Sequence, residues 1–182
     1  MTYVPHFFLQ SADVFLGPSV PAEIELEKLT EWSNDQNVTY YMYAGLTPFF
    51  QVDVRPLHAW GPNQHVFACY DSETRFLGTA GLYGIQPTHR AAEYRIFLGN
   101  KPYWGRGYGT QVTQAILGYG FGRLNLHSIW LGVNEHHIRA YNLYKKVGFV
   151  EEGCLRERFF RDGYHDMIRM SILEDEWRSR QE

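Results

Sequence analysis

The sequence predicts one α/β domain of the layered α+β kind, with helices flanking a central mixed, mostly antiparallel, twisted sheet. Its 182 residues, 45% hydrophobic and 20% charged, suffice for one compact core and are too few for two. Short apolar runs separated by turn residues come first, and a strand–helix–strand–helix–strand order follows. Neither a repeat nor a low-complexity linker interrupts the chain. We therefore expect a single domain over residues 1–182, with about seven strands and about four helices.

The strands follow from short apolar runs bounded by turn signals. They are expected at residues 7–15, 65–70, 76–84, 92–98, 128–133, 149–160 and 164–173. The last two flank Arg161, Asp162 and Gly163, where the glycine supplies the positive φ that a tight turn needs. The sheet should therefore finish in a hairpin.

Four segments have apolar residues at helical spacing. They are residues 23–32, 51–60, 108 to about 124, and 136–147. The third starts directly after a glycine-rich turn and loses helix propensity toward its end, so it should stop before Asn125. Gly148 is placed to cap the fourth helix.

Charge and composition exclude several classes of partner. The net charge is −3 and the basic residues are scattered, so we expect no nucleic-acid partner. No stretch approaches the roughly 20 apolar residues that span a bilayer, so we expect no membrane partner. The two cysteines, Cys69 and Cys154, lack the spacing of a redox or metal motif, which favours a reducing, cytoplasmic location. The sequence leaves open whether the protein forms a homodimer.

The glycine-rich turn is the strongest chemical signal. Glycines let backbone N–H groups approach an anion, and a helix N-terminus adds about half a positive charge, which suits a pyrophosphate. The alternative is a turn that only connects a strand to a helix. The glycines of the turn are spaced G-x-G-x-G, which matches neither the dinucleotide-binding fingerprint nor a P-loop. The residues of this turn are Trp104, Gly105, Arg106, Gly107, Tyr108, Gly109 and Thr110.

Three segments together resemble the GNAT superfamily of acetyl-CoA-dependent N-acetyltransferases. They are the strand at 93–98, this glycine-rich turn, and the segment 133–149, which ends A-Y-N-L-Y-K-K-V-G-F. The closing stretch, with E-G-C-L-R-E at 152–157, is similar to the branch that acetylates ribosomal-protein N-termini and includes many small-amine acetyltransferases. The resemblance covers about residues 65–175. It implies an acetyl-CoA-binding core there and acceptor-side helices at about residues 20–60.

The resemblance implies direct attack of a primary amine on acetyl-CoA, the cosubstrate, through a tetrahedral intermediate. The acceptor stays open among a protein N-terminus, a polyamine, an aminoglycoside and an amino acid. Two alternatives also stay open: a non-catalytic CoA-binding or interaction protein, and an oligomerisation module without cofactor binding. An aromatic run lies where the superfamily builds its acceptor wall, although packing would explain it equally. Its residues are Tyr40, Tyr41, Tyr43, Phe49 and Phe50.

The resemblance also implies a cofactor pose. The pantetheine arm would bond the backbone of Ile96, Phe97 and Leu98, and the pyrophosphate would bond the amides of residues 105–110. Trp104 stands where the family has Gln or Arg, so Arg106 would supply the cation or is a solvated turn residue.

A second departure precedes the last predicted helix. His137 stands where the family has a cofactor-contacting asparagine. Asn134 either compensates for this change or caps the helix.

Two residues are implied in catalysis. An alkyl amine, with a pKa near 10.4, must lose a proton before it attacks, and the leaving thiolate, near 8.5, must gain one. Glu93 would be the base, acting through a water, or else pairs with Arg95. Tyr144, four residues before Gly148, would be the acid, or else is a core tyrosine.

We expect no metal ion. The histidines considered, His127, His136 and His137, have no Cys, Asp or Glu set to complete a shell, and adjacent helical residues point to different sides.

Overall fold

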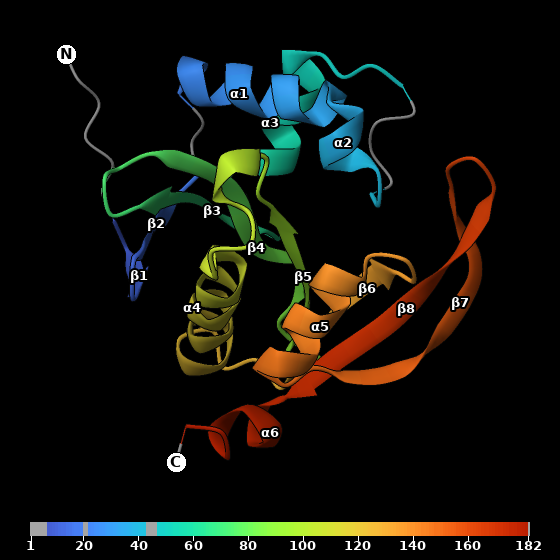
Figure 1. Ribbon diagram of the computed structural model, residues 1–182. Coiled ribbons are helices and arrows are strands. Elements are labelled where there is room, and N and C mark those ends of the chain that lie inside the picture. Colours follow the sequence, from blue (N-terminus) through green and yellow to red (C-terminus); the bar gives the residue numbers. More distant parts are fainter. Residues whose placement is uncertain (1–6, 20–21, 43–46, 182) are drawn as a thin grey trace.

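The computed structural model describes residues 7–19, 22–42 and 47–181 (Figure 1). Its centre is one sheet of eight strands in the order β1-β2-β3-β4-β5-β6-β8-β7. Neighbouring strands run antiparallel except β5 and β6, which are parallel, so the expected mixed, mostly antiparallel sheet is confirmed. The strands are β1 (Leu9–Ser11), β2 (Val14–Pro18), β3 (His65–Asp71), β4 (Phe76–Gln86), β5 (Ala91–Phe97), β6 (Ser128–Asn134), β7 (Val150–Phe160) and β8 (Tyr164–Leu173).

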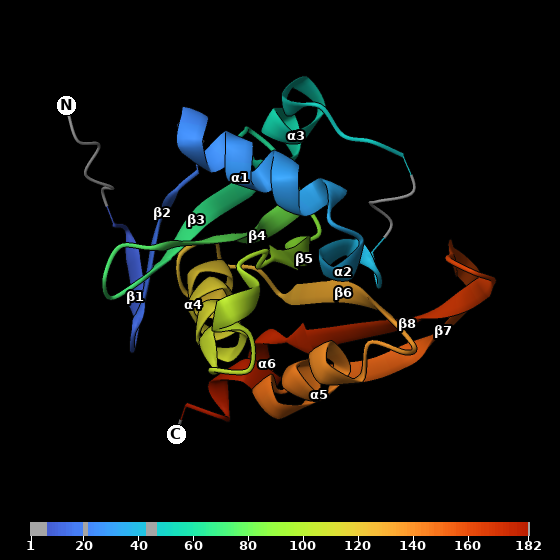
Figure 2. The ribbon, with the colours of Figure 1, turned by 45° about the horizontal axis from the view of Figure 1, so that its top comes forward.

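Helices cover both faces of the sheet, with α1 and α3 on one side and α4 and α5 on the other (Figure 2). Leu29 and Val54 pack on the first face, against Phe97, whereas Ile116 packs on the second, in the same core as Tyr94. In the described part of the chain, no helix is long and apolar enough to cross a bilayer. The helices are α1 (Glu23–Asn34), α2 (Gln36–Thr39), α3 (Gln51–His58), α4 (Tyr108–Gly122), α5 (Ile138–Val147) and α6 (Glu174–Arg178), with a 3₁₀ turn, η1, at Lys101–Tyr103.

The first strand differs from its prediction. Residues 7–15 were expected to form one strand, but the chain turns at Ala12, whose φ is 47°, and makes two strands, β1 and β2. Ser11 and Asp13, which are common in turns, flank Ala12, but alanine itself seldom takes a positive φ, so the expected strand was extended across the turn. The split gives the described chain eight strands in place of about seven. Two short helices, α2 and α6, raise the helix number above the expected four because neither is long enough to show helical periodicity.

The C-terminal hairpin forms as expected. Asp162 and Gly163 take φ values of 56° and 149° between β7 and β8. The pairing of β7 shifts register twice, between Glu151 and Gly153 and again between Leu155 and Phe159. Apart from Phe159, every residue of β7 is exposed.

The parallel strands β5 and β6 separate after three residue pairs. They pair from Ala91 with Ser128 to Glu93 with Trp130 and then stop. Meanwhile β5 continues to pair with β4 as far as Phe97, and β6 with β8 as far as Asn134. We call the unpaired part, residues 94–97 of β5 facing residues 131–134 of β6, the β5–β6 splay. It opens toward the carboxyl ends of both strands, the ends that lead to α4 and α5.

Candidate active site

The turn before α4 presents a row of backbone donors. Gly105 and Gly107 have φ values of 77° and 87°, and a Cβ at either would meet no heavy atom within 4 Å. Within the described residues, the backbone N–H groups from Gly105 to Gly109 have no hydrogen-bond acceptor, whereas Thr110 donates to the Gly107 carbonyl at 3.0 Å. Five consecutive N–H groups at a helix N-terminus are therefore available to an anion. The Thr110 amide was also expected to bind the pyrophosphate, but it already donates to the Gly107 carbonyl.

Gly109 has a different role from its neighbours. A Cβ there would lie 2.8 Å from a methyl carbon of Leu143, so the end of that side chain would have to shift. This glycine therefore allows α4 to approach α5 closely. The motif thus combines two requirements, backbone conformation at Gly105 and Gly107 and helix packing at Gly109.

Trp104 joins the turn to the end of β5. Its indole Nε1 donates to the carbonyl of Leu98 at 2.6 Å, which occupies one of the groups expected to bind pantetheine. The guanidinium of Arg139, from the first turn of α5, lies 4.7 Å from the centre of the Trp104 ring. Sequence reasoning missed Arg139 because only the packing of α5 beside the turn brings it there. Arg106 packs over Tyr103, at 5.2 Å from the ring centre, so two cations flank the turn.

The other pantetheine candidates lie on the β5–β6 splay. Ile96 and Phe97 belong to the part of β5 that has no pairing partner in β6. Their side chains pack on opposite faces, Phe97 with α1 and α3 and Ile96 with the core beneath α4 and α5. The strand is thus fixed on both sides while its edge toward β6 is unpaired.

Tyr144 has both a packed ring and an unbonded hydroxyl. The side chain is 8% exposed, and its ring contacts Tyr94 and Phe149 with centroid distances of 6.3 and 5.7 Å. Among the described residues its hydroxyl has no hydrogen-bond partner. Burial raises the pKa of this phenol above its usual 10, so it stays protonated at neutral pH. The ring belongs to the core, and the hydroxyl is in the form that a proton donor needs.

Glu93 lies on the opposite face of the sheet from Tyr144. Its neighbours Ala92 and Tyr94 point into the core beneath α4 and α5, so strand alternation directs Glu93 to the other side. The carboxylate, 21% exposed, accepts a hydrogen bond of 2.6 Å from Arg95, as the ion-pair alternative expected. Glu93 is also the last residue of β5 that pairs with β6, next to the β5–β6 splay, and its role as a base acting through a water stays a prediction.

Two variants separate these roles. If Glu93 prepares the amine, Glu93→Gln lowers turnover at neutral pH by about tenfold, less than direct acid–base catalysis contributes because a water carries the proton. The defect shrinks as pH rises toward the amine's own pKa near 10.4, since the amine is then already neutral. The measurement is a pH–rate profile. Arg95→Gln breaks the same ion pair but keeps the carboxylate, so it should keep the parent profile. Identical profiles for the two variants would leave Glu93 as an ion-pair residue only.

His137 stacks on Tyr41 at the start of α5. Their ring centres are 4.7 Å apart with 15° between the planes. Burial, and then the nearby Arg139, lower the pKa of His137 to about 4, so the ring is neutral at pH 7. Tyr41 belongs to the aromatic run expected at the acceptor wall, in which Tyr43 lies outside the described residues. The contact therefore joins the segment expected on the acceptor side to the segment expected to bind the cofactor.

Asn134 holds the turn that leads into α5. Its side-chain oxygen accepts the backbone N–H of His136 at 2.9 Å, and its side chain is buried. This bond closes a turn before the helix and is not a helix cap, because α5 begins at Ile138 with His137 as its N-cap residue, so the capping alternative was wrong. It holds the chain just before the helix that carries Tyr144.

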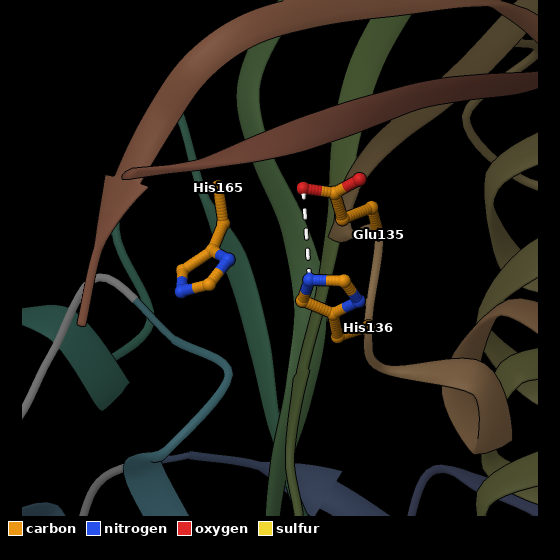
Figure 3. A group of neighbouring side chains, drawn as sticks. All are labelled: Glu135, His136 and His165. Carbon is orange, nitrogen blue, oxygen red and sulfur yellow. Dashed lines mark ion pairs between the residues drawn. The ribbon is translucent and has the colours of Figure 1, made fainter. Parts of the chain in front are cut away.

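The histidines group differently from the set considered in the sequence. His136 lies beside Glu135 and His165, and one ligand atom from each falls within 4.8 Å of the others (Figure 3). His165 was missed because it belongs to β8, far from His136 in the sequence. A local pattern could not have shown this contact.

Comparison with known proteins agrees with the geometry. Residues 18–150 match the family profile of the acetyltransferase (GNAT) domain. The chain is 32% identical to spermidine N(1)-acetyltransferase of Vibrio cholerae serotype O1, over 87% of this chain and 92% of that protein. It is 35% identical to spermidine N(1)-acetyltransferase of Escherichia coli K12, over 58% of this chain and 61% of that protein.

Solved structures show the same likeness. The crystal structure of spermidine N-acetyltransferase from Vibrio cholerae in complex with CoA and spermine has a TM-score of 0.80 and 29% identity to this chain. The match covers 91% of this chain and 98% of that one. The chain therefore belongs to the GNAT family of acetyltransferases, which transfer the acetyl group of acetyl-CoA to an amine.

Proposed function

We propose that this acetyltransferase acts on a polyamine, at a primary amine of a spermidine-like chain. The observation that carries the proposal is the 32% identity to a spermidine N(1)-acetyltransferase across 92% of that protein's length. It is supported by the fold similarity to an enzyme crystallised with CoA and spermine.

The charge of the acceptor-side helices agrees with a polycationic substrate. Helix α1 carries four glutamates and one lysine, and Asp35 follows it. Two of these glutamates, Glu27 and Glu31, are exposed one helical turn apart. A surface with an excess of carboxylates raises the local concentration of a cation such as a polyamine.

The roles that we propose divide between the two faces of the sheet. The segment from about residue 20 to 60 forms the side of the site that binds the amine acceptor. The segment from about residue 65 to 175 binds acetyl-CoA. The N–H groups of residues 105–109 would hold the pyrophosphate, with Arg106 and Arg139 nearby, and the unpaired edge of β5 would bond pantetheine. Glu93 takes a proton from the amine through a water, and Tyr144 gives one to the departing sulfur.

An acceptor panel tests this proposal. Release of CoA thiol is measured from acetyl-CoA with spermidine, spermine, an aminoglycoside, an amino acid and a peptide with a free N-terminus. We expect the two polyamines to give the highest kcat/KM and the peptide to stay at background. The Tyr144→Phe protein in the same assay shows that the thiol release comes from this site. Preferred turnover of the peptide or the aminoglycoside would overturn the polyamine proposal and leave the acetyltransferase activity intact.

A further inference from the structure

A group of two histidines and one carboxylate lies outside the roles described so far. Glu135 and His136 directly follow β6, and His165 is the second residue of β8. The His136 Nε2 atom is 3.9 Å from a carboxylate oxygen of Glu135, and the two histidine ring centres are 5.0 Å apart. Figure 3 shows the ring of His165, a residue of β8, facing the side chains of Glu135 and His136 in the connection after β6.

The distances are close to those of a metal site. One ligand atom from each residue lies within 4.8 Å of the other two. A zinc ion holds its nitrogen ligands at about 2.0–2.1 Å, so two of them are at most about 4.2 Å apart. The His136 side chain is 60% exposed, so it is free to turn toward the other two ligands when an ion binds.

The backbone already orients two of the three ligands. His165 Nε2 lies 2.8 Å from the carbonyl oxygen of Arg161. Since a carbonyl only accepts, Nε2 carries the proton of the neutral ring, and Nδ1 is then the nitrogen with the lone pair that a metal ion needs. A metal-binding histidine almost always donates its second ring N–H in this way. Glu135 is held similarly, because its Oε1 accepts the backbone N–H of Asp166 at 2.8 Å.

We propose that Glu135, His136 and His165 bind one divalent transition-metal ion of the Zn²⁺ class, with solvent completing its coordination. Imidazole suits Zn²⁺, Co²⁺ and Ni²⁺, whereas Mg²⁺ and Ca²⁺ prefer oxygen ligands throughout. Two imidazoles and one carboxylate with an open position form a known zinc ligand set. The nearby Asp166 carboxylate is not included, because it bonds the Glu157 N–H and the Cys154 thiol.

The site links the connection before α5 to the C-terminal hairpin. Glu135 and His136 lie in the connection from β6 to α5, the helix that carries Tyr144, and His165 lies in the C-terminal hairpin. A bound ion joins this connection to β8 and stabilises the folded chain, because an ion bound only by the native state shifts the unfolding equilibrium. The family's chemistry needs no metal, so ion binding is separate from the transfer step.

Direct binding measurements test the proposal on the full chain. Zn²⁺ is measured by equilibrium dialysis, and Co²⁺ by its visible absorption, which reports the coordination of the ion. We expect one equivalent of ion, a higher Tm with Zn²⁺, and at least tenfold weaker binding in His136→Ala and in His165→Ala. His136 is exposed, so its variant carries little risk to folding. His89→Ala removes an exposed histidine in the turn between β4 and β5 and should bind like the parent.

The variant Cys154→Ser tests the competing explanation that the ion binds to the exposed thiol of Cys154. It should also bind like the parent. The proposal is overturned if the parent binds neither ion, if His136→Ala and His165→Ala bind as the parent does, or if only Cys154→Ser loses binding.

Discussion

Replacing Tyr144 by Phe should lower turnover by about 10²–10⁴-fold, the range that general acid catalysis contributes. The change deletes one hydroxyl and keeps the ring against Tyr94 and Phe149. Acetyl-CoA affinity should stay within a few-fold, because the proposed phosphate and pantetheine contacts lie elsewhere. The Tm should hardly change, since the hydroxyl has no hydrogen-bond partner among the described residues. Steady-state kinetics, calorimetric binding and thermal unfolding measure the three quantities.

Tyr94 provides a matched control in the same core. Its hydroxyl is buried and lies 2.9 Å from the hydroxyl of Thr113, so Tyr94→Phe removes a formed hydrogen bond. That variant should lose about 1 kcal/mol of unfolding free energy and keep its turnover per folded molecule. The proton-donor role of Tyr144 is wrong if the two variants behave alike, each losing stability and neither losing turnover.

Replacing Gly107 by Asp should weaken acetyl-CoA binding by about 100-fold, which corresponds to about 2.8 kcal/mol. The new carboxylate would stand at the start of α4, where a short acidic side chain accepts the exposed N–H groups that the phosphates need. It would also repel the pyrophosphate directly. CoA should lose affinity to the same extent, because it shares these contacts. Isothermal titration with both ligands measures the loss.

Two further variants isolate the cause. Gly107→Ala tests the positive φ alone, and a side chain in this conformation costs roughly 1–2 kcal/mol of stability. Gly84→Asp places the same charge at a glycine with φ of 56° and open surroundings in β4. It should unfold more easily and still bind acetyl-CoA like the parent. Undiminished affinity in Gly107→Asp would show that the turn is only a chain connection.

Long, regular elements could be predicted because their pattern repeats within the element. The expected start of α4 at residue 108 and its end before Asn125 match Tyr108–Gly122, and Gly148 caps α5 with φ of 119°. The turn at Ala12 was missed, although Ser11 and Asp13 flank it, because an alanine seldom takes the positive φ that this turn has. Likewise, α2 exists because Asp35 caps four residues, which is too few for periodicity.

The residues of the proposed site also differ in whether the local sequence could reveal them. The glycine turn and Tyr144 were identified from short stretches of contiguous sequence. The contacts of Trp104 with Arg139 and of Tyr41 with His137 join distant segments, so no local pattern carries them. Gly109 could not be interpreted correctly from the sequence alone. The motif suggested that all three glycines serve the pyrophosphate, whereas Gly109 lies against the Leu143 side chain.

The last strand of the sheet also bears on how the protein avoids aggregation. An outermost strand offers a row of unpaired N–H and C=O groups onto which another chain can add, and β7 is eleven residues long. Its two register shifts make the strand irregular, and at the second the Glu157 N–H donates to the Asp166 carboxylate of β8 in place of a backbone carbonyl. Charged side chains cover much of the remainder. They are Glu151, Glu152, Arg156, Glu157 and Arg158. An irregular, charged border of this kind disfavours pairing with a strand of another chain.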